Sequence, residues 1–286
     1  HICEVDVGKE KLVQIVCGAS NVKAGIKVIV ALEGAKLPGG EIKKTELRGV
    51  QSNGMICALC EVGLEENTKE NYAKGIFVAP DNLKVGAQAI PALGLETTLY
   101  ELDIHKHRNN DCYYHIGFAY EIASILNRKV KLPDMSYKTN DDDVSNYISL
   151  EVDTPKCPYY TGRMATNLTI KESPEFIKKR LLAAGMHPIN NVVDISNYVM
   201  LEFGQPLHFF DKDTLGEKIL VRNAYEDEKL VTLDNNERTL KTSDIVITDG
   251  KKPICLAGVM GGLDTEVTSR TKNIFMEAAI FDNISI

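Results

Sequence analysis

The residue types that could do chemistry gather in a few stretches, and the most unusual stretch spans residues 188–211. Asn190, Asp194 and Asn197 recur at three- to four-residue spacing, so they share one face of a predicted helix. Amides are unusual on a merely solvated helix, where Lys and Glu are favoured. His208 follows a Gly-Gln-Pro bend at a loop edge, where its imidazole could donate a hydrogen bond or act as a base. The alternatives are an ordinary polar helix face and a structural histidine.

A glycine-rich stretch and a lone carboxylate form the second candidate. Gly258, Gly261 and Gly262 fall within five residues, which would let a backbone approach a ligand closely and expose its N–H groups. The alternative is a glycine-rich bulge between strands. Glu277 stands alone in an apolar run, and a buried carboxylate there needs a partner, from protein or ligand. If that strand alternates, Glu277 points opposite to Met276, into a cavity or out to solvent.

A basic stretch near the start is the third candidate. Lys43, Lys44 and Arg48 alternate with apolar residues on a predicted strand, and a sharp Asn53-Gly54 turn follows. Further cations that could extend this surface are Lys23, Lys27 and Lys36. The pattern favours a strand edge of a small barrel that contacts the backbone phosphates of a nucleic acid. The alternative is a solvated strand face with a hairpin turn.

The usual enzyme and metal motifs are missing. The sequence has no G-x-x-x-x-G-K-[ST] loop, no G-x-S-x-G elbow and no H-E-x-x-H. Cys57 and Cys60 form a single C-x-x-C with no second pair or His at finger spacing, so we expect two ordinary thiols and no metal. The 7 Cys are scattered and odd in number, which is typical of reduced thiols in the cytoplasm.

The composition of the 286 residues, 44% hydrophobic and 26% charged, is that of ordinary globular protein, and the length predicts about two domains. The net charge of −7 argues against coating nucleic acid through bulk charge but leaves room for a local basic face. No apolar run is long enough to span a bilayer, so we expect no membrane association. The start, His1–Asp6, lacks an initiator Met and a signal-peptide layout, so we expect a piece of a longer chain.

The pattern of predicted strands and helices differs between the two halves of the chain. Residues 1–95 hold short β-rich runs at 12–17 and 27–32 between glycine turns, which predicts a small β-barrel. A strand at 99–104 and an amphipathic helix at 117–126 come next.

The second half alternates helices and strands. A solvated acidic linker is predicted at 136–146. A helix capped by Ser173 and stopped at Gly185 precedes a second helix, 191–203, ended by Gly204. The predicted strands are 149–152, 219–222, 229–233 and 244–248.

Several of these stretches carry a resemblance to one known family. They are Leu47–Cys57, Glu101–Ile104 with Arg108–Cys112, Asn190–Asp211 and Ala257–Gly262. In family order, and over essentially the whole chain, they resemble the β subunit of bacterial phenylalanyl-tRNA synthetase.

The resemblance implies an α+β, multidomain fold. Residues 1–95 would form a five-stranded OB-type barrel that binds tRNA, and residues 96–146 the remainder of an N-terminal α/β domain and a linker. Residues 147–286 would form a mixed α/β editing domain of the B3/B4 type that is incomplete at its C-terminus. The resemblance also implies a cytoplasmic ligase of protein biosynthesis, an α2β2 heterotetramer that charges tRNA(Phe). The α subunit carries out aminoacylation with ATP and Mg²⁺, so this piece alone cannot aminoacylate and holds no cofactor.

The family's editing site removes tyrosine wrongly attached to tRNA(Phe). The resemblance implies His208 and Glu277 as catalytic residues, with a pocket formed by Ser196, Asn197, Pro206, Gly261 and Gly262, and tRNA contacts from Lys43, Lys44, Arg48 and Asn53. Glu277 would accept the phenol of tyrosine, and His208 with backbone donors would orient the attacking water.

Two residues depart from the family's pattern. Ser196 stands where Thr is common, and Phe209 stands where Ala is common and could narrow the pocket beside His208. The competing interpretation is a non-catalytic tRNA-binding and assembly module with a decayed editing pocket.

Overall fold

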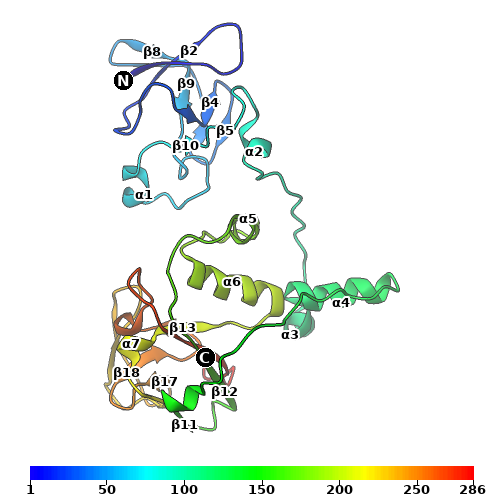
Figure 1. Cartoon of the computed structure of the whole chain (residues 1–286), viewed down its shortest axis with the longest axis vertical. Helices are drawn as coiled ribbons and strands as arrows, with labels where there is room; N and C mark the ends of the chain where they lie inside the picture. The colour runs from blue at the N-terminus through cyan, green and yellow to red at the C-terminus, as the bar shows by residue number, and fades with distance from the viewer. The chain divides into compact units, whose positions relative to one another are not determined.

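The structure, a computed structural model, describes residues 1–286, and they divide into two compact units (Figure 1). Unit 1 contains residues 1–100 and 182–187, and unit 2 contains residues 101–181 and 188–286. None of the helices combines the length and the apolar character that crossing a bilayer requires. Strands and helices mix throughout, as the predicted α+β class requires.

Unit 1 consists of short strands that pair two at a time, all antiparallel. The pairs are β1 (Ile2–Val5) with β2 (Val13–Val16), β3 (Lys27–Val28) with β10 (Val78–Ala79), β4 (Val30–Leu32) with β9 (Gly54–Ile56), β5 (Lys36–Leu37) with β6 (Gly40–Glu41), and β7 (Thr45–Leu47) with β8 (Val50–Ser52). Two short helices follow, α1 (Lys69–Ala73) and α2 (Ala89–Ala92). Ile15, Ile56 and Ile76 are buried in its main core.

The predicted five-stranded barrel is not confirmed, because the five ladders stay separate two-stranded pieces. Strands of two to four residues offer few backbone groups for a second partner. Where β2 and β8 meet, a side chain makes the link: Val16 N donates to Ser52 Oγ at 3.0 Å. The β-rich run at 27–32 is likewise split into β3 and β4, which pair with different strands.

The sharp turn predicted at Asn53-Gly54 is wrong, because the hairpin closes five residues earlier. Arg48 and Gly49 connect β7 to β8 with φ angles of 52° and 79°. Positive φ at both central residues is the type I′ geometry that suits the twist of two-residue hairpins. Asn53 instead sits at the corner between two ladders, where its backbone N–H donates to Gln14 O at 2.9 Å.

The first part of unit 2 is helical. It contains η1 (Lys106–Arg108), α3 (Asn109–Cys112) and α4 (His115–Ile125), so the predicted helix is confirmed and the strand at 99–104 is wrong. Leu99 and Tyr100 are more than two-thirds exposed, and no neighbouring strand offers them a ladder. Arg108 ties the helices together through Nη2, which lies 2.7 Å from Glu121 Oε2.

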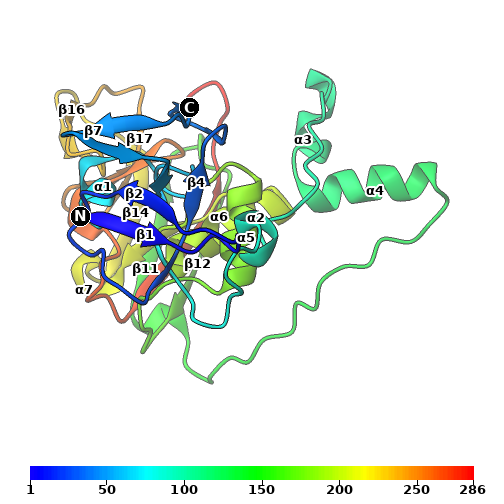
Figure 2. The ribbon, with the colours of Figure 1, turned by 90° about the horizontal axis from the view of Figure 1, so that it is seen from above.

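The segment after α4 runs without helix or strand until η2 (Val144–Asn146) (Figure 2). Its acidic residues are not merely solvated. Asp143 caps η2 by accepting from Ser145 N at 2.8 Å, and Asp142 accepts from Asn146 Nδ2 at 3.1 Å.

The rest of unit 2 is built on two sheets. The five-stranded sheet has the order β11 (Ser149–Asp153), β14 (Lys218–Asn223), β17 (Ile245–Thr248), β18 (Pro253–Leu256) and β19 (Met260–Gly261), with only β11 and β14 parallel. The three-stranded antiparallel sheet has the order β12 (Tyr159–Ala165), β20 (Ile274–Ile280) and β13 (His208–Asp211). The other elements are α5 (Glu175–Ala183), α6 (Asn191–Phe203), α7 (Lys212–Leu215), β15 (Lys229–Val231), β16 (Glu237–Thr239) and η3 (Leu263–Thr265).

The main core of unit 2 lies between these two sheets. Phe210 and Phe275 come from the three-stranded sheet and Ile219, Val221 and Ile247 from the five-stranded sheet, and all five belong to one buried cluster. This face-to-face packing gives one side of β13 and β20 a dry environment. Any polar side chain on that side is therefore buried.

The polar residues of α6 stabilise the helix and its surroundings. Asn190 caps α6 by accepting from the backbone N–H groups of its second and third following residues, at 3.0 Å each. Asp194 is fully buried and accepts from Ser173 Oγ at 2.5 Å and from Ile189 N at 2.8 Å. Ser173, predicted to cap α5, is used in this contact, and Gly204 ends α6 with a φ of 76°, as predicted.

Candidate functional site

His208 and Glu277, far apart in the sequence, lie directly opposite each other on neighbouring strands. His208 on β13 pairs with Glu277 on β20, and two residues along each strand Phe210 pairs with Phe275. Side chains at directly paired positions stand on the same face of a sheet. The two candidate residues therefore share the inner face of the three-stranded sheet with the aromatic core.

Glu277 is a buried carboxylate with one protein partner. Its residue is 5% exposed, and the Tyr160 hydroxyl donates to its Oε2 at 3.1 Å. Burial raises the pKa of Glu277 to about 7, against the opposing effect of the Tyr160 hydrogen bond. The carboxyl group therefore exchanges its proton close to neutral pH.

His208 is half-buried beside it, with its ring edge-on to Phe210 at a centroid distance of 4.4 Å and an angle of 81°. Burial lowers the pKa of His208 to about 4, so the imidazole is neutral at pH 7. Neither ring nitrogen bonds to the protein, and neither is among the fully buried unpaired atoms, which are His187 Nδ1 and Thr265 Oγ1. In the neutral ring one of these nitrogens is a donor and the other an acceptor, and neither is used by the protein.

Of the glycine pair in the second candidate stretch, Gly261 packs against this histidine and Gly262 packs against the backbone of Ile254. A Cβ added to Gly261 would lie 2.4 Å from His208 Cε1 and 2.8 Å from Nε2, and a Cβ on Gly262 would lie 2.4 Å from Ile254 O. Gly262 N also donates to Ile254 O at 2.8 Å. The glycines thus permit close approach, while the Gly262 N–H is used within the sheet and is not free for a ligand.

The predicted pocket residues on α6 and the bend after it have different positions. Ser196 Oγ donates to Leu207 O at 2.7 Å, which holds the residue before His208 against the helix. Asn197 is half-buried without a side-chain hydrogen bond, and Pro206 is exposed. Phe209, expected to narrow the pocket, pairs with Met276, so its side chain points to the face opposite His208.

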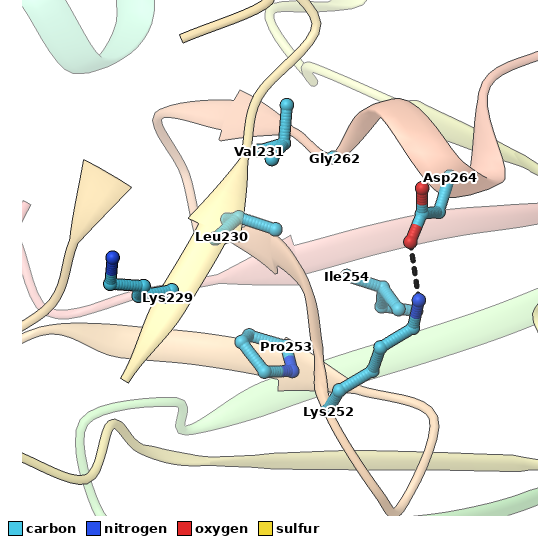
Figure 3. A pocket seen from close by; sticks show the side chains of 8 residues that line it. All are labelled: Lys229, Leu230, Val231, Lys252, Pro253, Ile254, Gly262 and Asp264. Carbon is cyan, nitrogen blue, oxygen red and sulfur yellow. Dashed lines mark hydrogen bonds and ion pairs between the residues drawn. The ribbon is translucent and has the colours of Figure 1, made fainter. Parts of the chain in front are cut away.

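The linings of two cavities of unit 2 do not include His208 or Glu277. The first, of about 140 Å³, is shown in Figure 3 and is lined by Lys229, Leu230, Val231, Lys252, Pro253, Ile254, Gly262 and Asp264. Lys252 and Asp264 form an ion pair at its mouth. The second, of about 270 Å³, is lined by residues 168–170 and 269–272. Of the predicted pocket residues, only Gly262 lines one of these two cavities.

The predicted tRNA contacts in unit 1 fall into two groups. Lys43 and Arg48 are exposed and make no ion pair, and Lys44 is exposed with Glu33 at 3.1 Å. Asn53 is half-buried and makes its hydrogen bonds to Gln14 O. The cations are therefore open to a ligand, while Asn53 stabilises the corner between ladders.

Two family models match the chain. The model described as "B3/4 domain" matches residues 156–286, which include β12, β13 and β20, and the model described as "Putative tRNA binding domain" matches residues 1–88. The phenylalanine–tRNA ligase β subunit of Staphylococcus haemolyticus is 48% identical over 100% of this chain, and that of Geobacillus kaustophilus is 50% identical over 98%. The chain belongs to the phenylalanine–tRNA ligase β-subunit family.

The chain spans 36% of the length of the first of these phenylalanine–tRNA ligase β subunits and 35% of the second. Among solved structures, an N-terminal fragment of the phenylalanyl-tRNA synthetase β subunit from Pyrococcus horikoshii is similar, with 17% identity and a TM-score of 0.37. That similarity covers 64% of this chain and 56% of that chain, and it is too low to define the fold.

Sequence reasoning missed Tyr160, the partner of Glu277. The signal that could have found it is the unmet need of Glu277 for a donor, together with a β-rich run in which Tyr160 and Gly162 alternate with outward-facing residues. Which strand lies beside Glu277, however, is decided by the pairing of β12 with β20.

Proposed function

We propose that the chain is the tRNA-binding and proofreading part of a phenylalanine–tRNA ligase β subunit, and that unit 2 hydrolyses tyrosine from wrongly charged tRNA(Phe). The observation that supports this most is the direct pairing of His208 with Glu277 inside the segment that matches the B3/4 domain. A buried carboxylate of raised pKa beside a neutral imidazole whose nitrogens make no hydrogen bond to the protein is an arrangement suited to hydrolysis.

The proposed chemistry uses water as the nucleophile. The water oxygen attacks the ester carbonyl carbon, the bond to the ribose oxygen breaks, and one proton of the water passes to that ribose oxygen. Tyrosine, with the water oxygen in its carboxyl group, and uncharged tRNA leave. With its pKa lowered to about 4, His208 is a weak base, so its part is to orient the water by hydrogen bonding. Gly261 leaves the room that the imidazole needs for this.

Glu277 supplies the discrimination between tyrosine and phenylalanine. Its free oxygen, Oε1, accepts the phenol of a bound tyrosyl group. A phenylalanyl group in the same place would leave that oxygen desolvated and unpaired, which costs about 1–3 kcal/mol. A site of this kind corrects an error that the first, synthetic pocket of a synthetase makes too often.

Around this site we propose the three-part organisation predicted from the sequence. Residues 1–95 form an OB-type tRNA-binding domain in which short ladders take the place of a closed barrel, 96–146 complete an N-terminal α/β domain with a linker, and 147–286 form the editing domain. The partner is an α subunit in an α2β2 cytoplasmic enzyme that uses ATP and Mg²⁺. We assign ATP and Mg²⁺ to this partner, as the family resemblance implies.

A non-catalytic tRNA-binding and assembly module is the second candidate. It is favoured by one observation, that the linings of the two cavities described above include neither His208 nor Glu277.

Hydrolysis of Tyr-tRNA(Phe) by the complete two-subunit enzyme separates the two candidates. We expect tyrosine release that is lost in the double variant His208→Ala, Glu277→Ala, while aminoacylation with phenylalanine persists. Release that is absent from the wild type, or unchanged in the double variant, would establish the assembly module instead.

A further inference from the structure

The two oxygens of Glu277 differ in their surroundings. Oε2 accepts from the Tyr160 hydroxyl at 3.1 Å, whereas Oε1 has no protein donor and is not among the fully buried unpaired atoms. His208, although directly opposite, makes no hydrogen bond to either oxygen. One oxygen is thus held by the protein, and the other has no protein partner.

Tyr160 is firmly fixed in this position. It pairs with Ala279 on β20, two residues from Glu277, which makes it a diagonal neighbour on the same face. Its ring packs against the main core of unit 2. Gly162 lies directly opposite Glu277, and a Cβ there would be 2.1 Å from the Phe275 ring. The other diagonal neighbour on this face is the apolar Met164, so Tyr160 is the hydrogen-bond donor that β12 places beside the carboxylate.

We propose that Tyr160 is the positioning residue that sets substrate specificity at this site: its hydroxyl holds Oε2 of Glu277 and leaves Oε1 as the acceptor for a substrate hydroxyl. This inference rests on the proposed editing function. Because a buried carboxylate with a fixed donor on one side cannot rotate freely, the remaining lone pairs keep one direction. The substrate class is an aminoacyl ester whose side chain ends in a phenol.

Tyr160 is also the group that favours the ionised form of Glu277. The ionisable groups facing this carboxylate are Tyr160 on β12, His208 on β13, Cys255 on β18 and Cys157 before β12. Burial raises the pKa values of both thiols, and burial together with Glu277 raises the pKa of Tyr160, so all three stay protonated. Removal of the Tyr160 hydroxyl would therefore raise the pKa of Glu277 further.

The test is Tyr160→Phe in the complete two-subunit enzyme, with hydrolysis of Tyr-tRNA(Phe) and Phe-tRNA(Phe) followed from pH 6 to 9. The matched control is Tyr159→Phe, since Tyr159 is 58% exposed, faces the other side of β12 and makes no hydroxyl bond. At neutral pH we expect the Tyr/Phe ratio of hydrolysis rates to fall roughly 10-fold in Tyr160→Phe, and to stay unchanged in the control. The difference between Tyr160→Phe and wild type in this ratio should become smaller as pH rises and Glu277 ionises.

Other outcomes would overturn the inference. An unchanged ratio, or an equal loss for both esters at every pH, would make Tyr160 a packing residue. Glu277→Ala, measured in parallel, separates this failure from that of the proposed function: if Glu277→Ala leaves the ratio unchanged, the editing proposal fails and the role of Tyr160 falls with it. If Glu277→Ala abolishes the preference and Tyr160→Phe does not change it, only the role of Tyr160 is wrong.

Discussion

The cations of unit 1 and the paired residues of unit 2 are held in opposite environments. Lys43, in the loop before β7, and Arg48, in the turn between β7 and β8, are exposed to water and make no ion pair, so neither lies on a strand as the sequence had predicted. His208 and Glu277 stand between two packed sheets, where burial moves their pKa values to about 4 and about 7. Exposed charges attract a ligand over long range, and salt screens that attraction. Buried groups interact only with atoms in contact with them, and pH changes their protonation. The two regions therefore differ in what perturbs them.

The largest expected effect is that of Glu277→Ala on substrate choice. Loss of a charge-assisted hydrogen bond of about 1.5–3 kcal/mol should lower hydrolysis of Tyr-tRNA roughly 10- to 150-fold. Discrimination against Phe-tRNA should weaken as well, because no unpaired carboxylate remains. The measurement is the Tyr/Phe ratio of hydrolysis rates in the complete enzyme, and an unchanged ratio removes Glu277 from the site.

Gly261→Ala should damage the same region through sterics alone. The new Cβ would lie 2.4 Å from the His208 ring, which must move. We expect tyrosine release to fall roughly 10-fold and the free energy of unfolding to drop by about 1–3 kcal/mol, as overpacking does. Gly39→Ala is the control, because a Cβ there meets nothing within 4 Å. Equal effects of the two variants would contradict the close packing.

The stability of the chain should depend on pH through Glu277. Its folded pKa of about 7 lies above the ordinary value of 4.5, so the folded state binds more protons between these pH values. This contribution is fully present below pH 4.5 and is lost as pH rises to about 7, a change of about 3 kcal/mol. The pKa of His208 is lowered from 6.5 to about 4, so its contribution to folding stability grows as pH rises over most of this range, opposite to that of Glu277.

Glu277→Gln isolates the carboxyl contribution. The stability of this variant relative to wild type should rise between pH 4.5 and 7 and stay level above it. Denaturant unfolding at several pH values measures this. A constant difference would mean that the folded carboxyl titrates like a solvated one.

Unit 1 should respond to salt. We expect weak tRNA binding that falls steeply with salt, and joint neutralisation of Lys43, Lys44 and Arg48 should reduce the slope of log K against log salt concentration by about 2. Lys74→Gln is the control, because Lys74 belongs to the same unit but follows α1, outside the basic stretch of residues 43–48. An affinity for tRNA that does not depend on salt concentration, or that is unchanged in the triple variant, would exclude a basic contact surface.

The smallest effect is expected for Phe209→Ala. Since Phe209 points away from His208, the Tyr/Phe ratio should change less than about twofold, although the fold should lose about 2 kcal/mol of stability. A large change in the ratio would place Phe209 in the pocket after all.

Local sequence signals predicted elements well where capping and periodicity agree. The helix 191–203 has its bounds because Asn190 caps it and Gly204 adopts positive φ at its end. The same signals failed where pairing decides the outcome. The run 99–104 has the residues of a strand but finds no neighbour, and the turn expected at Asn53-Gly54 lies between strands that pair elsewhere.

The sequence by itself determined the family, the helix bounds of α6 and the unusual residue types at His208, Gly261 and Glu277. Tertiary structure alone decided that His208 faces Glu277, that Tyr160 holds that carboxylate, and that Phe209 turns away from both. The physical reason is that strand partners come from segments remote in the chain. The register of these paired strands, and not local propensity, decides which side chains share a face of the sheet and which are buried.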